Sequence, residues 1–146
     1  MTAAMPSRKT IDEALEEAAD RLSRVTALEA HDAMRDGAVV VDTRSPDQRA
    51  AQGYVPGAVH HPLSTLFWRL DPDFPTSNEK IPLDARVILI CREGFSSIFA
   101  AAQLQEIGFV EATDVIGGVA AWKAAGLPLL GQADQFAVDS DQAVAG

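Results

Sequence analysis

Apolar and polar residues alternate along the chain in blocks that predict alternating strands and helices. Two short runs, 38–42 and 86–91, are largely apolar, which is typical of strands buried on both faces of a sheet. Smaller strands are expected at 58–60 and 114–116, with helical spacing of apolar residues between the strands. Parallel sheets covered by helices on both faces produce this pattern, so we expect an α/β fold.

Start and stop signals set the expected bounds of the helices. Thr10-Ile-Asp-Glu13 and Thr26-Ala-Leu-Glu29 have the spacing of capping boxes, in which side chains satisfy the first free N–H groups of a helix. The first box begins an amphipathic helix over 11–24. Further helices are expected at 27–36, 46–52, 96–107 and 119–125, with one or two helical turns in 62–70.

The chain divides into three expected parts. Residues 1–25 form an N-terminal extension that carries the amphipathic helix, 26–130 form one domain, and 131–146 form a polar, flexible C-terminal tail. The extension either packs on the domain or serves as a dimer or partner interface. A chain of 146 residues is long enough to bury one core without disulfides or metals.

Composition excludes several classes of function. With 21 acidic against 12 basic residues, the formal net charge of −9 repels nucleic acid and anionic membranes, so neither is expected as a partner. The stretch up to Leu22 lacks the apolar core of a secretory signal, and no run reaches the roughly 18 apolar residues of a membrane span. We therefore expect a cytoplasmic protein. Adjacent His60 and His61 point to opposite faces of a strand, so no metal site is expected there.

The single cysteine, Cys91, is the strongest candidate for chemistry. It ends the apolar run 86–91, and sites in α/β sheets form at the carboxyl ends of strands. The segment CREGFSS follows the strand, and Gly94 allows a turn that points N–H groups inward. These groups, the next helix and Arg92 favour a reactive thiolate, whereas Glu93 opposes it. The alternative is a small apolar residue that merely ends a core strand.

Three segments in order resemble the rhodanese-like domain, a family of cysteine sulfurtransferases. VVVDTRSPDQRAAQGYVPGAVHHPL resembles the family's D-x-R segment and the following G-H-I-P-G-A, and VILICREGFSS resembles the active-site loop, often C-R-x-G-x-R-S. VIGGVAAWKAAGLPL resembles the closing G-G-x-x-A-W-x-x-x-G-L-P, where Gly117-Gly118 is read as a helix-entry turn. The resemblance covers about residues 26–130 and implies a five-stranded parallel sheet flanked by helices.

The resemblance also implies a reaction and its partners. Cys91 would attack the outer sulfur of a donor such as thiosulfate, carry it as a persulfide and pass it to cyanide or an acceptor thiol. The partners would be these small molecules, with a protein sulfur acceptor as a further option; no cofactor is needed, and a monomer or weak homodimer is expected. The implied substrate-binding residues follow the cysteine: Arg92, Glu93, Gly94, Phe95, Ser96 and Ser97.

Asp42 and Arg44 match the family's D-x-R motif. We expect Arg44 to form a structural ion pair and Asp42 to support the active-site loop through hydrogen bonds, both in supporting roles. Two positions depart from the family, because Tyr54 replaces a usual histidine and Ser96 replaces an arginine that many members carry. The missing cation, together with Glu93, favours a persulfide, polysulfide or thiol donor over doubly charged thiosulfate.

Two other functions fit part of the pattern. A cysteine phosphatase shares the loop geometry but needs an arginine six residues after the cysteine, where this chain has Ser97, and usually a histidine where it has Ile90. A non-catalytic rhodanese-like module for binding or sulfide sensing is the second alternative. Three further residues either line the rim of the pocket or simply pack: Phe67, Trp68 and Arg69.

Overall fold

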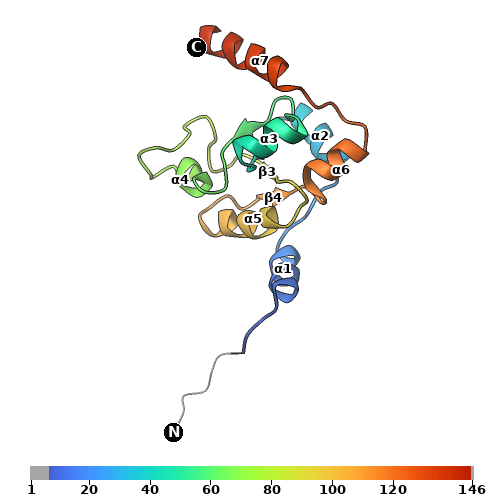
Figure 1. Cartoon of the computed structure of the whole chain (residues 1–146). Helices are drawn as coiled ribbons and strands as arrows, with labels where there is room; N and C mark the ends of the chain where they lie inside the picture. The colour runs from blue at the N-terminus through green and yellow to red at the C-terminus, as the bar shows by residue number, and fades with distance from the viewer. Residues whose placement is uncertain (1–6, 146) are drawn as a thin grey trace.

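The computed structural model describes residues 7–145 as a parallel sheet with helices on both faces (Figure 1). Four strands lie in the order β2-β1-β3-β4. Their bounds are β1 Val39–Asp42, β2 Val59–His60, β3 Val87–Ile90 and β4 Thr113–Asp114. The two apolar runs of the sequence form the central pair, β1 and β3, which are joined along their whole length. The predicted α/β fold class is confirmed.

Apart from the last one, the helices lie where the sequence signals predict them, but the first ends at Asp20 instead of the predicted residue 24. Residues 21–24 leave the helix and lead to Val25, which pairs with the sheet edge. Their bounds are α1 Ile11–Asp20, α2 Ala27–Arg35, α3 Pro46–Gln52, α4 Leu66–Leu70, α5 Ser96–Glu106, α6 Gly118–Ala124 and α7 Gln132–Ala145. Both predicted capping boxes form, because the hydroxyls of Thr10 and Thr26 accept the N–H groups of Glu13 and Glu29. Ser45 caps α3 in the same way, with a glutamine completing the box.

The apolar pattern predicted four strands and the resemblance to the family implied five, whereas residues 7–145 contain a sheet of four. Beyond the β4 edge, Val25 forms an isolated parallel bridge with Val115. The N–H of Val25 donates to the carbonyl of Asp114 (N···O 3.1 Å), and the N–H of Ile116 donates to the carbonyl of Val25 (2.8 Å). One bridged pair is too short for a strand, but it extends the hydrogen-bonding of the sheet into the N-terminal segment.

Side chains of the central strands alternate between two apolar cores, one on each face of the sheet. Val40 and Ile88 point to the core shared with α2 and α6, where Trp122 is fully buried. Val41 and Leu89 point to the core shared with α4 and α5. Burial on both faces explains why these strands are continuous apolar runs in the sequence.

Helix α1 packs on the outer side of α5. Ala18 forms a small apolar cluster with Ile98 and Ala102 of α5. The described part of the N-terminal extension therefore packs on the domain, one of the arrangements that the sequence left open. Residues 1–6 of the extension lie outside the described residues.

The segment 131–146, predicted as a flexible tail, contains helix α7 at the opposite end of the molecule from α1 (Figure 1). An amide of Gln135 bonds the Asp139 carboxylate one turn later (2.9 Å). Seven of its fourteen residues are polar and most of the others are alanine, so the apolar pattern that would predict this helix is weak. Gly146 lies outside the described residues. Within residues 7–145, no helix combines the length and apolarity needed to cross a membrane.

His61 is a buried residue that anchors the long loop 71–84 after α4. Its Nε2 accepts a hydrogen bond from the side-chain amide of Asn78 (3.1 Å). Burial, and then the charges of Arg69 and His60, lower the pKa of His61 to about 4. The fold therefore holds this imidazole in its neutral form.

We predict that the protein loses stability in mild acid because of His61. The unfolded chain binds this proton with a pKa of about 6.5, whereas the folded chain binds it near 4. The stabilisation is therefore complete above pH 6.5 and is lost as the pH falls toward 4. Between pH 7 and pH 5 the free energy of unfolding should fall by about 1–2 kcal/mol through this group.

Urea unfolding of the wild type and of His61→Gln at both pH values measures this effect. Other titrating groups contribute to both proteins alike, so the difference between the two losses isolates His61. An equal loss in both proteins would contradict the prediction.

Candidate active site

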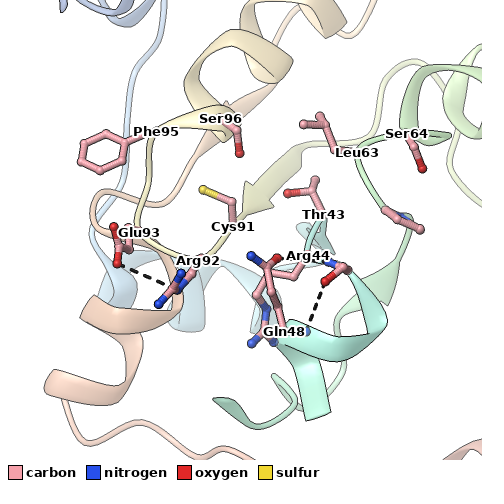
Figure 2. A pocket seen from close by; sticks show the side chains of 12 residues that line it. Thr43, Arg44, Gln48, Leu63, Ser64, Cys91, Arg92, Glu93, Phe95 and Ser96 are labelled. Atoms are coloured by element: carbon pink, nitrogen blue, oxygen red, sulfur yellow. Dashed lines mark hydrogen bonds and ion pairs between the residues drawn. The ribbon is translucent and has the colours of Figure 1, made fainter. Parts of the chain in front are cut away.

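Cys91 follows directly after β3, at the carboxyl end of the central strand pair. Only 5% of the residue is exposed, which alone would fit a core cysteine. Its sulfur, however, faces a cavity of about 480 Å³ at the sheet edge (Figure 2). Three loops line the cavity, and they include residues 43–48 after β1, 62–64 after β2 and 91–96 after β3. This is the edge at which parallel sheets bind their ligands.

The backbone of the loop after Cys91 is held by the start of α6. The carbonyl groups of Cys91 and Arg92 accept hydrogen bonds from the N–H groups of Val119 (2.8 Å) and Ala120 (3.1 Å). The opposite side of the loop turns toward the sulfur, and the N–H of Gly94 donates to Cys91 Sγ at an N···S distance of 3.1 Å. The predicted inward N–H group is therefore present.

The glycine pair before α6 lets these two segments approach closely. A Cβ on Gly94 would lie 2.5 Å from the backbone nitrogen of Gly117, and one on Gly118 would overlap the carbonyl oxygen of Cys91. All three glycines also have positive φ angles. The sequence identified this pair only as a helix-entry turn. The structure makes it the contact surface of the active-site loop.

A hydrogen-bonded network extends behind the sulfur. Ser97 Oγ lies 3.1 Å from Cys91 Sγ and donates to Asp114 Oδ2 (2.6 Å). Arg24 Nε donates to Asp114 Oδ1 (2.7 Å), and its Nη2 donates to Asp114 Oδ2 (3.1 Å) and to the carbonyl oxygen of Gly94 (3.1 Å). Asp114 is fully buried, so Arg24 supplies the charge partner that a buried carboxylate requires.

Sequence reasoning missed both Asp114 and Arg24. The available signal was a carboxylate at the start of the short strand expected at 114–116, since a charged group at a buried strand is rarely left without a partner. Arg24 gave no such signal, because it stands in the polar end of the N-terminal extension, 90 residues before its partner.

Hydrogen bonds decide the ionisation of Cys91. Burial by itself raises the pKa of the thiol. The side chain and N–H of Ser97, the side chain of Ser96 and the N–H of Gly94 lower it more, so the pKa of Cys91 lies below the usual value of a thiol. The sulfur is therefore held in an environment that favours the thiolate.

The predicted substrate-binding residues divide between the two sides of the sulfur. On the cavity side are Arg92, Glu93, Phe95 and Ser96 (Figure 2). Gly94 and Ser97 do not line the cavity and bond the sulfur from behind. The side chains of Arg92 and Glu93 are more than half exposed and approach each other at 3.9 Å. Hydrogen bonds, rather than the expected Arg92 cation, thus lower the thiol pKa.

Asp42 and Arg44 form the expected ion pair, fully buried and 2.8 Å between Oδ2 and Nη2. Arg49 Nε also donates to Asp42 (3.2 Å). These bonds hold the segment between β1 and α3, instead of the active-site loop that Asp42 was predicted to support. The link to the loop comes from Thr43, whose N–H and hydroxyl both bond the carbonyl of Ile90, one residue before the cysteine.

Phe67, Trp68 and Arg69, considered as rim residues, lie outside the lining of this cavity. The first two line a separate groove beside α4 and α5. Leu63 and Phe95 occupy the rim instead, and both are exposed apolar side chains. The mouth of the cavity is therefore apolar on two sides.

A comparison with protein families decides what kind of site this is. The family model described as a rhodanese-like domain matches residues 26–125. The chain belongs to the rhodanese-like domain family. The resemblance seen in the sequence is confirmed, and Arg24 lies just before the matched range.

Curated relatives of this rhodanese-like domain carry sulfurtransferase names. The thiosulfate sulfurtransferase GlpE of Ectopseudomonas mendocina is 38% identical over 101 residues, which cover 69% of this chain and 84% of that protein. Thiosulfate sulfurtransferase 16, chloroplastic, of Arabidopsis thaliana is 31% identical over 73% of this chain and 91% of its own length. These relatives support a rhodanese-like sulfurtransferase in general.

Solved structures share the fold. The polysulfide-sulfur transferase homodimer of Wolinella succinogenes matches with a TM-score of 0.65 at 21% identity, covering 82% of this chain and 85% of that one. Protein RPA3614 of Rhodopseudomonas palustris, described as of unknown function and a possible tyrosine phosphatase, matches with a TM-score of 0.77 at 27% identity. It covers 86% of this chain and 99% of its own.

The geometry of this rhodanese-like domain argues against phosphatase chemistry. Ser97 occupies the position where a phosphatase needs its phosphate-clamping arginine, and it contacts the carboxylate of Asp114.

We predict that Cys91 ionises below the ordinary thiol pKa of about 8.5. The pH dependence of iodoacetamide alkylation measures this directly, because the chain has one cysteine and so no other thiol contributes. A half-point at or above the ordinary value would show that the loop does not stabilise the thiolate.

A matched pair of glycine variants tests which contact shapes the loop. Gly118→Ala places a methyl group against the Cys91 carbonyl and should move the alkylation half-point back toward the ordinary value. Gly126→Ala is the control, since Gly126 also has a positive φ but no atom within 4 Å of the added Cβ. Equal half-points in the two variants would contradict the role given to the contact with α6.

Proposed function

We propose that this rhodanese-like domain is a sulfurtransferase that carries a sulfane sulfur on Cys91 as a persulfide. The observation that supports it most is the placement of Cys91 Sγ, which faces the cavity with Gly94 N and Ser97 Oγ each 3.1 Å away. Donors at these positions favour the thiolate, which is the attacking form of the residue. The names of the curated relatives agree with this chemistry.

The first half-reaction loads the cysteine. The Cys91 thiolate attacks the outer sulfur of the donor, and a new Sγ–S bond forms as the donor's S–S bond breaks. The leaving group departs with the electron pair, as sulfite from thiosulfate or as a thiolate from an organic persulfide. The step is a displacement at sulfur, so it needs no external oxidant or reductant.

The second half-reaction returns the cysteine to its starting state. An acceptor thiolate or cyanide attacks the outer sulfur of the persulfide, and Cys91 leaves as a thiolate. The hydrogen bonds that stabilise the attacking thiolate also stabilise this leaving group, since both are the same species. One arrangement of donors therefore serves both halves of the cycle.

The charges at the cavity favour a persulfide or polysulfide donor over thiosulfate. Arg92 and Glu93 oppose each other at the mouth, and Ser96 is neutral where many family members carry arginine. The apolar side chains of Leu63 and Phe95 at the rim suit an organic group on the donor. A doubly charged anion gains little in such a cavity, because its desolvation is not offset by a surplus of positive charge.

A non-catalytic binding or sulfide-sensing module is the second candidate, and the altered loop charge is what favours it. Such a module would bind or take up sulfur without passing it to an acceptor in repeated cycles.

The cytoplasmic location and the monomeric or weakly dimeric state also stay predictions.

Intact-mass measurement tests the proposed persulfide. After incubation with thiosulfate or a polysulfide, the protein should gain one sulfur, and cyanide or dithiothreitol should remove it. Cys91→Ala should gain none and should lose all turnover, while keeping the circular dichroism spectrum of the folded protein. Undiminished turnover in this variant would end the persulfide proposal, and sulfur uptake without turnover in the wild type would favour the sensing module.

Loop charge should govern the choice of donor. Glu93→Lys changes the charge at the cavity mouth by two units and should favour doubly charged thiosulfate. Glu93 is half exposed, so we expect roughly a tenfold gain in kcat/KM, equivalent to about 1.4 kcal/mol. A neutral organic persulfide should gain much less.

The control for this prediction is Glu111→Lys. It makes the same charge change on an exposed residue just before β4. This residue lies at the amino ends of the parallel strands, whereas Cys91 lies at their carboxyl ends. Kinetics of both variants with both donors, at low and moderate salt, separate a local effect from a change in net charge. The idea fails if thiosulfate and the neutral donor respond equally to Glu93→Lys.

A further inference from the structure

The network behind Cys91 contains a single proton that two acceptors require. The hydroxyl of Ser97 has one hydrogen, and it lies 2.6 Å from Asp114 Oδ2 and 3.1 Å from Cys91 Sγ. While Cys91 is a thiol, its S–H donates to Ser97 Oγ and the hydroxyl donates to Asp114. Once Cys91 is a thiolate, its sulfur can only accept, so the Ser97 side chain lowers the pKa of Cys91 only by turning its hydroxyl toward the sulfur.

Ionisation of Cys91 therefore takes a hydrogen bond away from Asp114. The carboxylate of Asp114 is fully buried, so the lost hydrogen bond is not replaced by solvent. Asp114 also places a negative charge behind a sulfur that is becoming negative. For both reasons, Asp114 opposes the thiolate that the rest of the loop favours.

Arg24 limits this opposition. Its guanidinium holds both oxygens of Asp114, so the carboxylate retains two hydrogen bonds and its charge is neutralised when the Ser97 hydroxyl turns away. The same guanidinium bonds the carbonyl of Gly94, the residue whose N–H donates to Cys91 Sγ. The backbone bridge of Val25 to β4 fixes the position from which Arg24 reaches the loop.

In the part of the chain that the structure describes, the other charged groups around the sulfur lack this connection. The first turns of α5 and α6 carry no charged residue. Arg44, after β1, is bound to Asp42 through its guanidinium. In the loop itself Arg92 and Glu93 point to the exposed side and pair with each other.

We propose that Asp114 and Arg24 are positioning residues that control the ionisation of Cys91 in opposite directions through the Ser97 hydroxyl. Asp114 holds the hydroxyl proton in the resting thiol, and Arg24 makes its release to the thiolate possible. An arginine outside the range matched by the family thereby becomes part of the active site. The role of the pair in turnover rests on the proposed function, whereas its effect on the thiol does not.

The test is the alkylation half-point of the only cysteine in three variants. Asp114→Asn should lower the half-point by about 0.5–1 pH unit, because it removes the negative charge behind the sulfur. Arg24→Gln should raise it by a similar amount, since it leaves Asp114 uncompensated. The control is Arg21→Gln, which removes an equal charge from the same extension, at a residue that pairs with Glu106 on the surface.

A double-mutant cycle tests the path through the hydroxyl. In a Ser97→Ala background, Asp114→Asn should shift the half-point by less than half as much as in the wild type. An undiminished shift would overturn the path through Ser97 and leave only a direct charge effect.

The proposal would be overturned if the half-point shifted in the same direction in Asp114→Asn and Arg24→Gln, or in neither variant. The ion pair would then have only a structural role. If Asp114→Asn does not fold, the comparison of Arg24→Gln with Arg21→Gln still tests the proposal. The Arg24 side chain is partly exposed, so Arg24→Gln should fold, and the alkylation half-point of Cys91 in this variant must rise.

Turnover separates this inference from the proposed function. If the protein gains no sulfur in the mass experiment while the half-points shift as expected, the sulfurtransferase proposal fails and the positioning role stands. If sulfur transfer is intact but the half-points do not move, the positioning role fails alone. Where both hold, the acidic limb of the kcat/KM profile should shift with each variant in the same direction as its half-point.

Discussion

Two hydrogen bonds between backbone segments determine the shape of this active site. The N–H groups of Val119 and Ala120 hold the carbonyls of Cys91 and Arg92, and this contact forces the other side of the loop toward the sulfur. Glycines at the crossing point are what permit two backbones to come so close. The helix that follows β4 therefore acts on the nucleophile after β3 without any side chain of its own.

The arginines nearest the strand ends are used by the scaffold instead of the cavity. Arg44 and Arg49 are bound to Asp42, and Arg24 is bound to Asp114. Each buried carboxylate thus has its charge balanced within the protein, as low-dielectric surroundings demand. Among the charged residues that line the cavity, Arg44 is neutralised by Asp42, and Arg92 and Glu93 in the active-site loop oppose each other. Recognition of a sulfur donor by the cavity must therefore depend more on shape and apolar contact than on net charge.

Much of the fold was predictable because its determinants are local or periodic. The apolar runs of the central strands reflect burial on both faces of the sheet. The capping boxes at Thr10 and Thr26 reflect the need to satisfy free N–H groups at a helix start, and both signals lie within a few residues. Cys91 was predictable for a similar reason, since a strand, a thiol and a glycine turn are adjacent in the chain. Pairing between Arg24 and Asp114 was not, because it depends on a tertiary contact across 90 residues. Helix α7 escaped prediction because its apolar residues are mostly alanine and alternate with polar ones too closely to give a clear helical signal.

The separation of these parts along the chain has a consequence for biogenesis. The groups around the sulfur come from residues near 24, 94, 97, 114 and 119, so no short stretch of nascent polypeptide contains them together. Until α6 has been synthesised and docked, Cys91 is an ordinary thiol in an unconstrained loop. Contacts of such long range form late and together in folding. Reactivity of this cysteine is therefore a property of the finished tertiary structure, and a truncated or misfolded copy does not expose an activated nucleophile to the cell.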